Sequence, residues 1–143
     1  SPKSYTALSG AYFTLGLTAD AIAASAEQLR CGGYDTNPDG AYWTMGWCHL
    51  LEGEPLEAEA AFDQALALVP NQMRSLQFKA IAQVLLGKEK AALASVRRLR
   101  DVAPDETFDQ LAFFMTQNPR LARRSGEHVE ILRRLWEATE GKP

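Results

Sequence analysis

The 143-residue sequence predicts an all-α fold made of repeated helix pairs, and three observations support this. Gly53 and Gly87, each able to end a helix, lie 34 residues apart. Pro70 and Pro104, each able to stop a helix, are separated by the same 34 residues. Between residues 42 and 65, large and small residues alternate at helical spacing. Equal spacing of both kinds of signal indicates a repeat rather than chance.

The clearest pair is predicted over residues 39–72, DGAYWTMGWCHLLEGEPLEAEAAFDQALALVPNQ. Gly46 and Ala58 are small where two helices must approach closely, and Phe62 fills the space between them. Pro55 is tolerated at the start of the second helix, where its missing N–H has no intrahelical acceptor to lose. Residues 39–72 therefore resemble a tetratricopeptide repeat, a helix–turn–helix unit of 34 residues.

The remaining segments follow from the same pattern. A degenerate first pair is expected over about residues 2–35, with Gly16 at its turn and a three-residue insertion before the second pair. The third pair covers about residues 73–106, with helices near 73–86 and 89–101. Residues 107–143 leave the repeat. They predict a helix over 107–117, a polar, basic connection over 120–125, and an amphipathic helix over 127–140 that caps the stack.

The resemblance implies a single domain: a right-handed α-solenoid of three tetratricopeptide-like helix pairs plus two C-terminal capping helices. It also implies that the first helix of each pair lines a concave groove. The last third is similar to the C-terminal ends of bacterial tetratricopeptide regions attached to class III nucleotide cyclases or winged-helix regulators. The implied context is a bacterial multidomain regulator in the cytoplasm.

Groove-facing positions in the first helices are unusually apolar. Trp43 and Trp47 are one turn apart, and Phe78 follows in the next repeat. We expect them to form an exposed patch that binds a partner peptide or helix. The full predicted set is Phe13, Trp43, Trp47, Leu50, Arg74, Gln77, Phe78 and Ile81.

Other occupants of the groove stay open at this point. The chain's own segment 119–143 could fold back into it, a small molecule could fill it in a ligand-sensing or regulatory domain, another domain could cover it, or two copies could pair as a homodimer. A chaperone-type carboxylate clamp is not expected. The matching positions are Thr6, Gly10, Thr44, Arg74 and Phe78, and only Arg74 has the chemistry that the resemblance requires.

Composition and motifs argue against other classes of function. Nucleic-acid binding is not favoured, because the formal charge is −3 and no aromatic side chains lie among the arginines at 120, 123 and 124. A membrane span is not predicted, because no apolar run is long enough. Two cysteines make no disulfide framework. Asp35–Gly40 matches half of a calcium loop but lacks the closing glutamate, and no catalytic constellation, phosphate loop or dinucleotide motif is present. We therefore predict a non-enzymatic interaction module without metal or cofactor.

Overall fold

The computed structural model describes residues 2–32 and 37–141, with side chains from residue 5 onward, and these residues form helices without strands. The helices are α1 (Pro2–Thr14), α2 (Thr18–Cys31), α3 (Pro38–Leu51), α4 (Pro55–Leu68), α5 (Met73–Leu85), α6 (Glu89–Val102), α7 (Phe108–Thr116), α8 (Pro119–Ala122) and α9 (Gly126–Ala138), with a 3₁₀ turn, η1 (Arg123–Ser125), between the last two.

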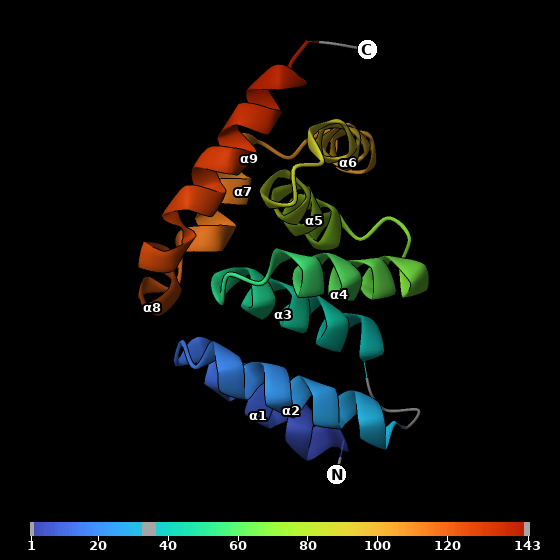
Figure 1. Ribbon diagram of the computed structural model, residues 1–143, viewed down its shortest axis with the longest axis vertical. Helices are drawn as coiled ribbons and strands as arrows, with labels where there is room; N and C mark the ends of the chain where they lie inside the picture. The colour runs from blue at the N-terminus through green and yellow to red at the C-terminus, as the bar shows by residue number, and fades with distance from the viewer. Residues whose placement is uncertain (1, 33–36, 142–143) are drawn as a thin grey trace.

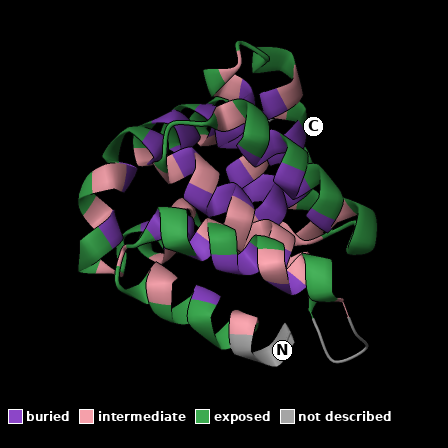
Figure 2. Ribbon diagram, turned by 60° about the horizontal axis from the view of Figure 1, so that its bottom comes forward, coloured by how far each residue is buried: buried purple, intermediate pink, exposed green. Residues whose placement is uncertain are grey.

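The first six helices stack as three antiparallel pairs in chain order (Figure 1). Helix α2 packs on α3 and α4 packs on α5, so each pair adds to the one before it. This arrangement confirms the predicted α-solenoid. Most buried residues lie between the second pair, the third pair and the C-terminal helices (Figure 2).

In the second and third pairs, the turn between the two helices contains the glycine that predicted it. Gly53 has φ +76° and Gly87 has φ +77°, in the left-handed region that a residue with a Cβ rarely adopts. Pro55 is the first residue of α4, as the missing N–H allows. Helix α7 begins with a capping box, in which the Thr107 hydroxyl accepts from the N–H of Gln110 at 3.2 Å.

Close packing inside the second pair explains its strong sequence pattern. Gly46 is buried against the ring of Phe62, which is itself fully buried. In the first pair the same place is taken by two hydroxyls, Ser9 and Ser25, whose oxygens lie 2.6 Å apart. The first pair therefore contains a hydrogen bond where the second contains an aromatic ring.

The C-terminal segment, defined here as residues 108–138, differs from the prediction in two ways. Residues 120–125, expected as a polar, basic connection, lie in α8 and η1. The segment also does more than cap the third pair, because it runs back along one side of the stack to the first pair (Figure 1). There the Asn118 side-chain amide donates to the carbonyl oxygen of Thr14 at 3.1 Å.

Candidate functional site

An aromatic cluster lies on the side of the stack formed by the first helices of the pairs. It consists of Phe13, Trp43, Trp47, Phe78 and Phe114, from α1, α3, α5 and α7. The ring of Phe114 stacks on Trp47, with centroids 5.4 Å apart and planes 26° apart. Phe13 meets the other side of the cluster, 4.7 Å from Trp47 between centroids.

The predicted exposed patch is corrected by this arrangement. Trp47 is 4% exposed and Phe78 is fully buried, because Phe114 covers the cluster from α7. Leu50, Gln77 and Ile81 are also buried, each with no more than 1% of the residue exposed. The Gln77 side chain donates to the backbone carbonyl of Leu111 in α7 at 3.1 Å.

The packing of the C-terminal segment against the stack also explains a basic residue before α9. Arg124 is half-buried and reaches the first and second pairs. Its guanidinium donates to the carbonyl oxygens of Gly16 at 3.3 Å and Leu51 at 3.1 Å, and to the Thr18 hydroxyl at 2.9 Å. Glu52 completes the contact, with its Oε1 3.3 Å from Arg124 Nη2. Arg124 therefore joins the C-terminal segment to the turns of the first and second pairs.

Three of the predicted groove residues remain partly accessible from solvent, namely Phe13, Trp43 and Arg74. Trp43 is half-buried at the edge of the aromatic cluster. Arg74 donates to Gln77 Oε1 at 2.9 Å, and its Nη2 lies 3.7 Å from Glu106. The guanidinium carbon stands 3.8 Å from the ring centroid of Phe114, a cation–π distance. Burial lowers the pKa of Arg74, and Glu106 opposes this.

Beside the closed cluster, a row of three cavities lies along α3, α5 and α7 and is here called the channel. The cavities have volumes of about 320, 210 and 710 Å³ and are called the junction, middle and end cavities. The junction and middle cavities share Asn37, Gly40 and Trp43 as walls, and the middle and end cavities share Arg74 and Phe114. The shared walls show that the three cavities adjoin one another.

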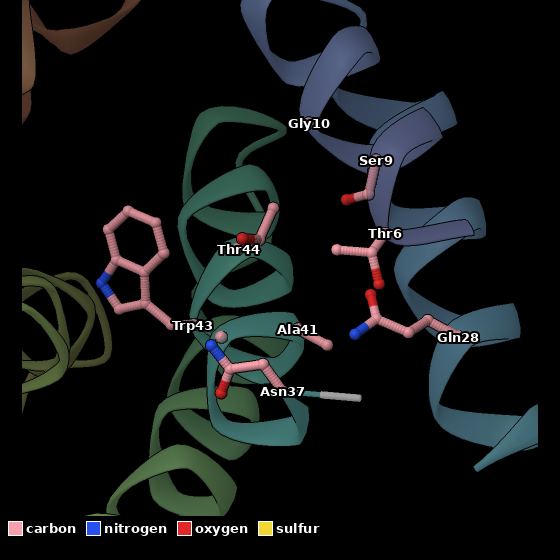
Figure 3. Close-up of a pocket in the computed structure, with 9 residues that line it drawn as sticks. Thr6, Ser9, Gly10, Gln28, Asn37, Ala41, Trp43 and Thr44 are labelled. Atoms are coloured by element: carbon pink, nitrogen blue, oxygen red, sulfur yellow. The ribbon is translucent and has the colours of Figure 1, made fainter. Parts of the chain in front are cut away.

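The junction cavity lies between α1, α2 and α3 (Figure 3). Thr6, Gln28 and Ala41 point into the gap between the first and second pairs, whereas the Trp43 ring points away from it. The end cavity is lined mainly from α7, including Phe113, which is 66% exposed and is the most exposed large apolar side chain described.

Sequence reasoning missed Phe113, Phe114 and Gln28. The apolar stripe of Leu111, Phe114 and Met115 was a usable signal, since three apolar residues at positions i, i+3 and i+4 predict one buried helix face. No local pattern could reveal that this face lies on Trp47, because that contact joins distant parts of the chain.

The described residues do not support a metal site or a reactive thiol at Cys48. They contain no group of three or more His, Cys, Asp and Glu side chains that could hold a metal ion, although Asp35 of the half calcium loop lies outside them. Cys48 is fully buried, and burial raises the pKa of its thiol to about 12, so it is a poor nucleophile. In the part of the chain that the structure describes, every helix is too short or too polar to cross a membrane.

A comparison with known families now bears on this architecture. The model of the tetratricopeptide repeat family matches residues 40–72, which are α3, α4 and their flanks. The second helix pair is a tetratricopeptide repeat. No curated protein matches the sequence. Tetratricopeptide repeats are generally protein–protein interaction modules, and their all-helical folds are typically non-enzymatic. The helical solenoid that contains this repeat has its first-helix side closed at the centre and open along the channel.

Proposed function

We propose that this chain binds an extended segment of a partner protein in the open channel. The observation that carries the proposal is the row of three adjoining cavities along α3, α5 and α7. A row of adjoining cavities suits an extended chain better than a single compact ligand, and recognition of extended segments is a recurring mode of protein binding.

The channel walls indicate the chemistry of the segment. Side-chain amides recur along them, at Asn37, Gln72, Gln110 and Gln117. The oxygens of Gln72 and Gln110 already accept hydrogen bonds from Ser75 and Thr107, so these two amides would use their remaining N–H groups to donate to a peptide backbone. Phe113 offers an exposed ring for an apolar side chain. The charged walls are Asp39, Arg74, Glu106 and Asp109, three acidic and one basic.

Because Arg74 already faces Glu106, the remaining carboxylates favour a segment with basic side chains. Of the predicted groove residues, Trp43 and Arg74 would contact the segment in this proposal. The other six would act from beneath, by fixing the wall formed by α3, α5 and α7.

The test compares Phe113→Ala with Leu56→Ala. Both residues are exposed to a similar degree, at 66% and 62%, but Leu56 lies on α4 and lines none of the three cavities. Peptides are first selected from a random library on the wild-type chain, and their affinities are then measured by fluorescence polarisation for each variant.

We expect Phe113→Ala to weaken binding about tenfold or more, which is ~1.4 kcal/mol, while Leu56→Ala binds like wild type. Equal affinity of Phe113→Ala and wild type would reject the channel as the binding surface. Circular dichroism of both variants checks that the fold is retained.

A second candidate function is regulation, in which the C-terminal segment acts as a built-in occupant of the groove. The contacts of Phe114 with the aromatic cluster and of Arg124 with the two turns favour it. In this form a partner would bind the predicted groove residues only after α7 and α8 had moved. The consequence for Arg124 is tested below.

A further inference from the structure

Helix α7 carries three phenylalanines, and two of them have an arginine over the ring. The guanidinium carbon of Arg133 stands 4.7 Å from the ring centroid of Phe108. The guanidinium carbon of Arg74 stands 3.8 Å from the ring centroid of Phe114. Phe113 has no such cation among the described residues, although 66% of it is exposed and a cation could reach it.

Each of these two arginines also meets a carboxylate. Arg133 Nε lies 3.2 Å from Glu130 Oε1, and Arg74 Nη2 lies 3.7 Å from Glu106 Oε1. A guanidinium is planar and weakly hydrated, so its face can lie on an aromatic ring while its edge meets a carboxylate. A ring together with a carboxylate is therefore the arrangement by which this chain holds arginine beside α7.

Phe113 has a carboxylate beside it as well. Asp109 precedes it by four residues in α7, so the two side chains lie on one helix face, with Cβ atoms about 5–6 Å apart. Both residues line the end cavity of about 710 Å³. Asp109 forms no ion pair with the described residues, whereas Glu106 in the same cavity faces Arg74. The end cavity thus has one carboxylate in excess, next to a ring without a cation.

We infer that the end cavity binds an arginine side chain of the partner segment, with the guanidinium on the Phe113 ring and its N–H groups donating to the Asp109 carboxylate. The assignment of the arginine to a partner segment rests on the proposed function. Lysine fits less well, because its ammonium group is compact and strongly hydrated and lacks the planar fork that bonds a carboxylate twice. The end cavity thereby selects arginine, rather than any basic residue, at one position of the segment.

The first experiment tests the end cavity without a peptide. Ethylguanidinium and ethylammonium are titrated at constant ionic strength into the chain with ¹³C-labelled phenylalanine, and the ring signals of Phe113 are followed by NMR. These signals are assigned by their loss in Phe113→Leu. Asp109→Asn removes the carboxylate charge, and Asp101→Asn, at an exposed position on α6 that lines none of the three cavities, is the matched control.

We expect ethylguanidinium to shift the Phe113 signals saturably, with an affinity about threefold or more above that of ethylammonium. Asp109→Asn should weaken ethylguanidinium binding about threefold or more, and Asp101→Asn should leave it unchanged. Unmoved ring signals, equal affinities for the two cations, or full binding by Asp109→Asn would overturn the inference.

The second experiment identifies the source of the guanidinium. Peptides selected from a random library on the wild-type chain should carry arginine at one position, and replacing that arginine with lysine should weaken binding about fivefold or more. The same replacement should weaken binding to Phe113→Leu by about twofold at most, because a leucine side chain is apolar but has no ring for the guanidinium to lie on.

The arginine site and the proposed function fail in different ways. Peptides that lose affinity for Phe113→Ala but show no preference for arginine would overturn the inference and leave the proposed function in place. Ethylguanidinium binding together with full peptide affinity of Phe113→Ala would reject the proposed function and leave the ligand class of the end cavity in place. A wild-type dimer that is lost in Phe113→Leu, measured by sedimentation velocity, would assign the arginine to a second copy and overturn its assignment to a partner segment.

Discussion

Gly46→Ala perturbs the closest helix–helix approach in the second pair. A Cβ added to Gly46 would lie 2.4 Å from Cε1 and 2.7 Å from Cδ1 of Phe62. Both distances are far below a normal carbon–carbon contact. The ring of Phe62 cannot turn aside freely, because it is fully buried and stacks on Phe78 at 6.2 Å between centroids. Either α3 and α4 separate or the ring leaves its position.

Two opposing effects set the magnitude. Alanine is a better helix former than glycine by about 1 kcal/mol, which favours the variant. Overpacking a rigid core costs about 1–3 kcal/mol, which opposes it. Gly10→Ala separates the two effects, since Gly10 lies inside α1 and an added Cβ would meet no atom within 4 Å. We expect Gly46→Ala to be about 1–3 kcal/mol less stable than Gly10→Ala.

Urea unfolding followed by circular dichroism at 222 nm measures both variants against wild type. The double variant Gly46→Ala with Phe62→Leu should recover part of the loss, because the smaller side chain makes room for the methyl group. If Gly46→Ala proves as stable as Gly10→Ala, the packing argument for the glycine of the second repeat is refuted.

Two further predictions concern the C-terminal segment. Arg124→Ala should raise the rate of amide hydrogen exchange over residues 119–126 about tenfold, because a charged donor to Gly16, Thr18 and Leu51 is lost. The exchange rates of the α5 amides should not change. Unchanged exchange over residues 119–126 would contradict the regulatory candidate. Burial lowers the pKa of His128 below its usual 6.5, despite the opposing charge of Glu127, so the unfolded chain binds a proton that the folded chain does not. The free energy of unfolding should therefore fall as the pH drops from 7 to 5. His128→Leu should lack this contribution when the urea midpoint is measured against pH. Parallel curves of urea midpoint against pH for wild type and His128→Leu would contradict the prediction.

Much of the fold could be predicted from local signals. Gly53 and Gly87 end helices because their positive φ angles favour residues without a Cβ, and Pro55 begins one because its nitrogen needs no acceptor there. Gly46 and Phe62 form a close contact within one repeat, so their spacing in the sequence already implied their packing. The candidate site was less accessible to this reasoning. Of the predicted groove residues, Trp43 and Arg74 line the middle cavity, whereas Trp47 and Phe78, which were expected to be exposed, are buried.

Sequence by itself determined the helix pairs, their 34-residue repeat and the residues packed within each pair, because these depend on turn chemistry and on neighbours a few turns away. Tertiary structure alone decided which surface stayed open. Asn118 meets Thr14 across 104 residues of chain, and Phe114 reaches Trp47 from a helix outside the repeat. Such contacts arise from the path of the whole stack, which sets how far α7 and α8 lie from the first pair. That path closes the aromatic centre of the groove and leaves the three cavities along α3, α5 and α7 open.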